Sequence, residues 1–183
     1  MFFIITLLVL AALALYIVAV YNSLVRLKNL CDEAWSGIDV QLKKRYNLIP
    51  NLVNSVKGYA KHEKDVFERV VEKRTAGINA RTVKEQEEAE AALSQSLMSL
   101  FALAENYPDL KANSNFLDLQ RQLQAIEDDI QKARRYYNAT VRDYNIRIES
   151  FPSNLVAQQM NYSRREFFEL ESVDQRLNPT VSF

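Results

Sequence analysis

The chain opens with MFFIITLLVLAALALYIVAVY, residues 1–21, which holds no charged side chain and a single aliphatic hydroxyl, Thr6. A bilayer core of about 30 Å is crossed by about 20 helical residues, so this run is long enough to span a membrane. The residues that follow are charged and helical in period. We therefore expect a transmembrane anchor over residues 1–21 that leads into a helical bundle.

A cleaved signal peptide is the alternative interpretation of this run. Signal peptides begin with a basic segment and end at a small-residue cleavage site after a shorter apolar stretch. No Lys or Arg precedes the run here, and the match Ala12-Leu13-Ala14 lies in its middle, with apolar residues continuing beyond. The sequence favours an uncleaved anchor that contacts the lipid bilayer through residues 1–21.

The basic residues beside the anchor predict its orientation. Arg26 and Lys28 follow it directly, and residues 22–60 hold six Lys and Arg against three acids. Basic flanks of a membrane span stay in the cytoplasm. We expect a single-pass protein with its amino terminus outside and its bundle in the cytoplasm.

Composition excludes several classes of function. The 23 basic and 23 acidic residues balance, so the charge does not point to a nucleic acid partner. The single cysteine, Cys31, has no second cysteine to pair with, and the single histidine, His62, cannot supply the two Glu-x-x-His pairs of a di-iron bundle. No two of the three glycines lie close enough to form a phosphate-binding loop. We expect no cofactor, no metal and no catalytic residue.

A first long helix is predicted where apolar positions step by threes and fours. It follows the anchor with no Gly or Pro between them, so the two are expected to form one rod. Pro50 lies within the pattern and predicts a kink without a break in packing. The apolar positions are Leu24, Leu27, Cys31, Trp35, Ile38, Leu42, Tyr46, Ile49, Val53, Val56 and Ala60.

A second helix is predicted from Val66 to Tyr107, with its pattern lost between Glu72 and Glu88. We interpret that middle part as frayed or projecting into solvent. It includes Gly77 and four acids, Glu85, Glu87, Glu88 and Glu90.

The third helix has the most regular pattern, from Phe116 to Phe151, with Asn113 or Ser114 as its N-cap. Phe151-Pro152-Ser153-Asn154 ends it and opens a shorter fourth helix that reaches Phe167. The predicted fold is all-α, an anchor over 1–21 continuous with an elongated antiparallel three- or four-helix bundle over 22–171. Residues 172–183 are expected to form a flexible tail.

Tyr-Asn pairs recur in the third helix beside arginines, and two interpretations stay open. In one, the tyrosines belong to the core and each hydroxyl finds a neighbouring Asn or Arg. In the other, the cluster forms a polar groove that holds a peptide or a lipid headgroup. The candidate groove residues are Arg134, Arg135, Tyr137, Asn138, Arg142, Tyr144 and Asn145.

The last three residues offer a second candidate contact. Val181 and Phe183 place apolar side chains at and two before the carboxyl end, a pattern that adds as a strand to carboxylate-binding modules.

Several stretches strongly resemble the LemA family, and the likeness covers nearly the whole chain. The resemblance implies a bacterial single-pass inner-membrane protein with a cytoplasmic antiparallel bundle and no established enzyme activity. Such proteins are discussed beside membrane zinc proteases and envelope quality control. The matching stretches are YNSLVRL (21–27), EAWSGIDVQLKKRY (33–46), LIPNLV (48–53), VKGYA (56–60), YPDLKAN (107–113), ARRYYN (133–138) and FPSN (151–154).

We therefore expect a non-catalytic scaffold or adaptor at the cytoplasmic face of the plasma membrane. Its partner would be a membrane or cytoplasmic protein, with a membrane protease as one candidate and a homo-oligomer left open. The alternative is a membrane-organising or lipid-binding oligomeric element.

Overall fold

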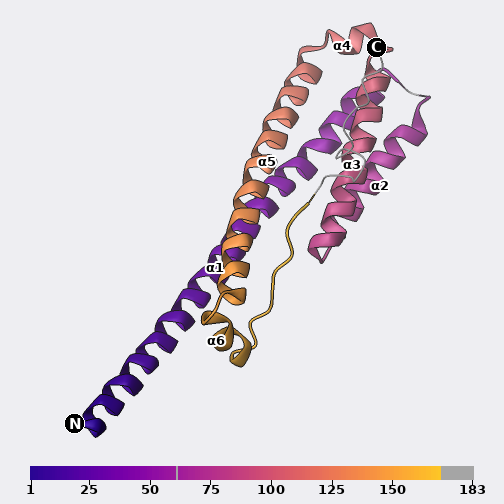
Figure 1. Ribbon diagram of the computed structural model, residues 1–183. Coiled ribbons are helices and arrows are strands. Elements are labelled where there is room, and N and C mark those ends of the chain that lie inside the picture. Colours follow the sequence, from indigo (N-terminus) through magenta and orange to yellow (C-terminus); the bar gives the residue numbers. More distant parts are fainter. Residues whose placement is uncertain (61, 170–183) are drawn as a thin grey trace, which may run out of the picture. The chain divides into compact units, whose positions relative to one another are not determined.

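The computed structural model describes residues 1–60 and 62–169 (Figure 1). Helices account for most of these residues, and no strand occurs among them, which confirms the all-α prediction. The helices are α1 (Phe2–Lys57), α2 (Lys64–Asn79), α3 (Val83–Ala104), α4 (Pro108–Lys111), α5 (Ser114–Glu149) and α6 (Ser153–Gln159).

The first helix, α1, is a single element of 56 residues that includes Pro50. Residues 1–19 are all exposed, whereas from Val20 onward α1 buries one side chain after another at steps of three and four. The predicted rod, in which the apolar run continues into a core helix, is thus confirmed. Ile49 and Leu52 on either side of Pro50 are both buried, so the apolar face is not interrupted there.

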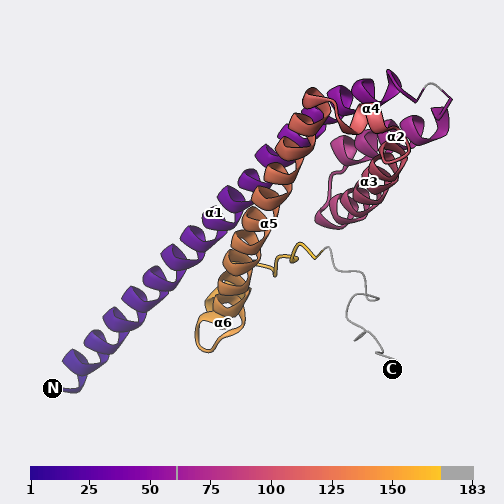
Figure 2. The same ribbon diagram turned by 90° about the horizontal axis from the view of Figure 1, so that it is seen from above.

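The chain divides into two compact units, and each is described by itself. Unit 1 comprises Met1–Asp39 and Gln131–Phe167. Within it α1 and α5 run side by side (Figure 1 and Figure 2). They are antiparallel, because Trp35 contacts Tyr137 with ring centroids 5.3 Å apart while the earlier part of α1 packs near the end of α5. That second contact is an apolar cluster of Val20, Leu24, Val156 and Ala157 with Ile148 and Tyr162.

Unit 2 comprises Val40–Ile130 and, within the described range, Phe168 and Glu169. Parts of α1 and α5 pack here with α2 and α3, which gives the antiparallel helical bundle that the sequence predicts. Lys57 lies over the ring of Phe67 between α1 and α2, and Phe101 meets Phe116 edge-on between α3 and α5. Each link between these helices is short, as expected for antiparallel neighbours.

The helix α5 buries a heptad row. Phe116, Leu123, Ile130, Tyr137 and Tyr144 are seven residues apart and all buried. Such a row is the seam of coiled-coil packing. Asn113 caps α5, because its Oδ1 accepts from the backbone N–H groups of residues 115 and 116.

The predicted second helix is wrong in one respect, since two helices occupy that stretch. The chain turns between Asn79 and Val83, and α2 and α3 pack against each other. Thr82 caps α3 by accepting from the N–H of Glu85, while the Glu85 carboxylate accepts from the N–H of Thr82. This reciprocal capping box fixes the turn. The apolar periodicity is lost between Glu72 and Glu88 because the chain turns there from one helix into the next.

The predicted fourth helix is shorter than expected. It ends at Gln159, and Phe167 lies outside it. Asn161 takes a left-handed conformation with φ of 56°, which an asparagine tolerates better than most residues. The N–H of Tyr162 donates to the carbonyl of Ala157 and that of Asn161 to the carbonyl of Gln158. This is the Schellman arrangement that closes a helix C-terminus.

Candidate functional site

After the Schellman turn, residues 162–167 form a non-helical stretch that we call the return segment. Both polar atoms of the Asn145 side-chain amide, on α5, form hydrogen bonds with the backbone of the return segment. The Asn145 Nδ2 donates to the carbonyl of Arg165, and the N–H of Arg165 donates to Asn145 Oδ1, each over 2.9 Å. A side-chain amide used in this way imitates the pairing of two extended backbones.

Three further contacts hold the return segment in unit 1. The Tyr137 hydroxyl donates to the carbonyl of Glu166 over 3.0 Å. The Arg165 guanidinium donates to Asp32 of α1 over 2.6 Å and lies 5.7 Å from the ring centre of Tyr144. Burial raises the pKa values of the Tyr137 and Tyr144 hydroxyls, so both stay protonated at neutral pH. Three of the predicted groove residues thus contact this chain's own segment.

The other predicted groove residues divide by burial. Arg134 is buried and Asn138 is half-buried. Arg135 and Arg142 are exposed, and Arg142 pairs with the neighbouring Asp143 at 3.0 Å. The structure therefore brings Tyr137, Tyr144 and Asn145 together around the return segment and leaves two arginines on the open face of α5. Whether a partner binds there stays a prediction, and Val181 and Phe183 lie outside the described residues.

A second polar cluster, in unit 2, was missed from the sequence. Glu90, which we expected in solvent, is buried and accepts from Arg45 Nη1 over 2.5 Å. The Tyr46 hydroxyl donates to the other oxygen of Glu90, and Gln86 Nε2 donates to Tyr46 over 2.8 Å. Arg45 also meets Ser94 at 2.8 Å and Glu127 at 2.8 Å. Through these contacts Arg45 connects α1 with α3 and with α5. Removal of one partner would leave the other charge buried without compensation.

Gly77 of α2 lies directly against this cluster. A Cβ at Gly77 would come within 2.5 Å of the Tyr46 hydroxyl and 3.1 Å of Glu90 Oε1. The glycine, which we expected to mark a frayed stretch, is instead buried where two helices approach closely. Burial and the nearby Glu90 carboxylate raise the pKa of Tyr46 well above its ordinary value.

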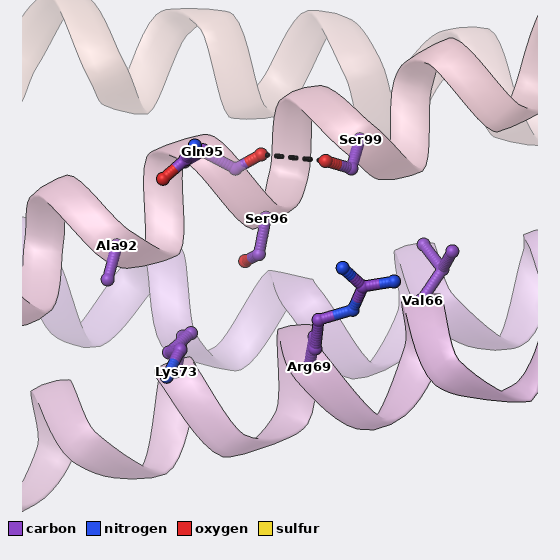
Figure 3. Close-up of a pocket in the computed structure, with 7 residues that line it drawn as sticks. All are labelled: Val66, Arg69, Lys73, Ala92, Gln95, Ser96 and Ser99. Atoms are coloured by element: carbon purple, nitrogen blue, oxygen red, sulfur yellow. Dashed lines mark hydrogen bonds between the residues drawn. The ribbon is translucent and has the colours of Figure 1, made fainter.

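Two of the open hollows in unit 2 lie beside the middle of α3. One, of about 230 Å³, has Val66, Arg69 and Lys73 of α2 facing Ala92, Gln95, Ser96 and Ser99 of α3 (Figure 3). Its cations have partners on their own helix, since Arg69 donates to the Asp65 carbonyl and Lys73 pairs with Glu72 at 2.8 Å. The other, of about 370 Å³, lies between α3 and α5 and includes Arg45, Met98 and Glu127. Neither hollow gathers a set of groups that would perform acid–base or nucleophilic chemistry.

No group of three or more His, Cys, Asp or Glu side chains in residues 1–60 and 62–169 is arranged to hold a metal ion. His62 is exposed and Cys31 is buried. Burial raises the pKa of the Cys31 thiol, which is the environment of an inert cysteine.

A comparison with protein families shows which family this chain is related to. The model of the LemA family matches residues 34–183, well over half of the chain and nearly all of both units beyond the apolar stretch. The chain belongs to the LemA family. The family match begins inside α1, so it includes the buried face of that helix from Ala34 onward and not the apolar run.

Curated relatives extend this result. Protein LemA of Metamycoplasma hominis is 28% identical over 157 residues, which cover 84% of this chain and 72% of that protein. Magnetosome protein MamQ 2 of Paramagnetospirillum magneticum is 26% identical over 175 residues, which cover 81% of this chain and 64% of that protein. Magnetosome protein MamQ of Magnetospirillum gryphiswaldense is 23% identical with the same coverage. The chain thus spans less than two thirds of the MamQ proteins, and none of these names is that of an enzyme.

Proposed function

We propose that this LemA-family protein is a membrane-anchored, non-catalytic adaptor whose helical part recruits a partner protein at the cytoplasmic face of a bacterial plasma membrane. One observation carries the proposal. The same helix, α1, is apolar and exposed over residues 1–19 and becomes a core helix from Val20 onward. Because no break separates the two parts, a lipid-embedded anchor would hold the packed helices at the membrane surface.

The flanking charges support a cytoplasmic location of the helical part. Arg26 and Lys28 lie on exposed positions of α1 directly beyond the apolar run. Exposed basic residues next to a span are retained on the cytoplasmic side. The non-enzyme names of the relatives support a non-catalytic role.

The exposed face of α5 in unit 1 is the contact surface that we propose for the partner. Arg135, Arg142 and Ile146 are all exposed, and their spacings of seven and four residues place them on one helix face. Arg142 pairs with the exposed Asp143, and such surface pairs are weak enough to be exchanged on binding. This face suits an acidic segment of a membrane or cytoplasmic protein, and a membrane protease is one candidate.

The test is site-specific photo-crosslinking of the full-length protein in its native membrane, with the photoreactive residue at position 146. A discrete crosslinked product is expected, and Arg135→Glu together with Arg142→Glu should abolish it through charge repulsion. Arg121→Glu is the matched control, since Arg121 is an exposed arginine of the same helix in unit 2. Products that are absent, or that persist unchanged in the double variant, contradict the proposal.

A membrane-organising role is the second candidate, favoured by the apolar side chains that remain exposed around α6, chiefly Phe151 and Leu155. An element of that kind changes the size or shape of the vesicles that contain it, whereas an adaptor leaves them unchanged. Electron cryomicroscopy of vesicles with and without the full-length protein separates the two roles.

A further inference from the structure

The corner between α5 and α6 combines an uncharged sequence with exposed apolar side chains. Residues 150–163, SFPSNLVAQQMNYS, contain no charged side chain, although a quarter of all residues are charged. Three apolar side chains in this stretch point away from the core, with Phe151 81% exposed, Leu155 58% and Met160 47%. A soluble protein seldom leaves such residues together in water.

This corner packs against the part of α1 that we assign to the membrane. The inner face of α6 contacts α1 through Val156 and Ala157, which meet Val20 and Leu24. Beyond that contact a crevice of about 350 Å³ lies between the two helices. The crevice is lined mostly by apolar side chains, with Gln159 as its one amide: Leu13, Tyr16 and Ile17 of α1, and Pro152, Leu155, Val156, Gln159 and Met160 of the corner.

The length of the apolar run decides where the corner must lie. From Phe2 to Tyr21 there are 19 steps of about 1.5 Å, or about 28 Å, which matches a hydrocarbon core of about 30 Å. Were the corner kept in water, only residues 2–12 would remain for the lipid, about 15 Å or half the core. A mismatch of that size is costly. If the whole run is embedded, the crevice beside Leu13 and Ile17 lies about 6–12 Å below the level of Tyr21, while the side chains of α6 that meet Val20 and Leu24 lie near that level.

Near both ends of α6, backbone groups of the corner are paired within the protein. The Ser153 hydroxyl contacts the carbonyls of Arg147 and Ser150 at 2.8 and 2.9 Å, and the N–H of Asn154 donates to the carbonyl of Ser150. At the other end the Schellman turn satisfies the carbonyls of Ala157 and Gln158. Backbone groups that enter lipid must be paired within the protein, and these bonds pair several of the groups near each end of α6.

We propose that residues 150–163 form a second membrane contact, immersed in the interface of the bilayer beside the anchor, with lipid acyl chains filling the crevice against α1. The depth of the crevice overlaps the depth of about 5–10 Å to which interfacial amphipathic helices bury their apolar faces. Tyr21 and Tyr162 then lie near the headgroups, where tyrosine is enriched, and the exposed Arg26 and Lys28 follow in the aqueous layer. This inference rests on the membrane anchoring put forward under Proposed function.

The test places a single tryptophan at the corner of the full-length protein in phosphatidylcholine vesicles that carry brominated acyl chains. The native Trp35 is first changed to Phe, which keeps an aromatic ring against Tyr137. Phe151→Trp should then emit at shorter wavelength than a tryptophan in water and lose most of its emission to bromine placed near the headgroups. Leu155→Trp is a second reporter, and circular dichroism checks that each variant keeps its helix content.

Two control variants separate this inference from the anchoring on which it rests. Tyr136→Trp introduces the ring at an exposed position of α5 and should behave as in water. Leu10→Trp lies near the middle of the run and should be quenched best by bromine near the chain ends.

Quenching of both corner reporters and of Leu10→Trp, but not of Tyr136→Trp, supports the inference. If Leu10→Trp is quenched while the corner reporters behave like Tyr136→Trp, the inference is overturned and the anchor stands. If Leu10→Trp is not quenched either, the proposed anchoring fails and the inference fails with it. A corner emission at short wavelength without quenching shows protein covering the corner, such as a second copy of this chain, and also overturns the inference.

Discussion

At the scale of single residues, Gly77 has a strict steric requirement. Its neighbours Tyr46 and Glu90 leave no room for a methyl group. Gly37 provides the contrast, because a Cβ there would meet nothing within 4 Å. Both glycines lie inside helices, where alanine has the higher intrinsic helix propensity by about 1 kcal/mol.

Gly77→Ala should therefore lower the free energy of unfolding by about 1–3 kcal/mol, since overpacking outweighs the gain in propensity. Gly37→Ala should leave it unchanged or raise it by up to about 1 kcal/mol. Urea unfolding in detergent, followed by circular dichroism, measures both. Equal stability of the two variants would show that the close approach around Tyr46 is absent.

The buried tyrosine beside Gly77 predicts how stability depends on pH. The pKa of Tyr46 is raised by its burial and by the Glu90 carboxylate, from an ordinary value of 10.0. The folded protein keeps this proton while the unfolded chain releases it, so the stabilisation is complete below about pH 10 and is lost as the pH rises above it. Urea unfolding at about pH 8 and about pH 11 should show the loss, and Tyr46→Phe should make the pH dependence shallower. A pH dependence that is as steep in Tyr46→Phe would assign the loss to other groups.

At the scale of elements, local patterns predicted the long helices and missed the contacts made across the sequence. The steps of three and four from Leu24 to Ala60 predicted the buried face of α1, and the N-cap of α5 was predicted at Asn113 or Ser114. Glu90 was misplaced because its partner, Arg45, lies on another helix, and no local period carries that information. The turn between α2 and α3 did have a local signal, the T-x-x-E motif of Thr82 and Glu85.

Removal of the cap tests the turn between α2 and α3. Thr82→Ala deletes the oxygen that accepts from the N–H of Glu85 and should lower the free energy of unfolding by about 1 kcal/mol. Thr75→Ala is the matched control, because Thr75 is exposed within α2 and its hydroxyl donates only to the helix carbonyl of Val71. Thermal or urea unfolding of both variants gives the comparison. A Thr82→Ala variant as stable as Thr75→Ala would show that the capping box does not stabilise the turn.

The return segment is an element whose attachment depends on few groups. Asn145→Ala leaves the N–H and the carbonyl of Arg165 without their partner, so the segment should detach more often. Trypsin should then cut after Arg164 and Arg165 several-fold faster than in the unaltered protein. Ile146→Ala, a change at the exposed neighbouring position, should leave the rate as it is. Equal rates in both variants would mean that Asn145 does not hold the segment.

At the scale of the whole molecule, the all-α class, the continuity of α1 and the family all followed from the sequence. The length of the fourth helix did not follow from the sequence. The apolar residues Phe167 and Phe168 continue a helical spacing, but the left-handed backbone of Asn161 ends the helix before them. The candidate groove divided into buried and exposed members for a related reason. The periodicity of α5 fixes which side chains face inward, and it does not say that a later segment of the same chain will contact them.

Anchoring is a property of the whole molecule and has its own prediction. Arginine at the centre of a membrane helix costs about 2.5–3.5 kcal/mol, so Leu7→Arg with Leu10→Arg should cost about 5–7 kcal/mol in insertion. This double variant should move to the supernatant on alkaline carbonate extraction, while the unaltered protein stays in the pellet. Ile78→Arg with Leu117→Arg, at exposed positions of unit 2, should stay in the pellet too. Retention of the anchor variant in the pellet would argue that residues 1–21 do not carry the attachment.

The burial of Cys31 has a practical consequence for determining sidedness. Its thiol is shielded from solvent and its pKa is raised by burial, so it forms little thiolate and should react slowly with maleimides. The side of the membrane on which a position lies can therefore be mapped with cysteines introduced into the native protein, without first replacing Cys31. A cysteine at the exposed position 106 should be labelled by a membrane-impermeant maleimide only after cells are permeabilised. Labelling of intact cells at that position would place the helices on the outer side.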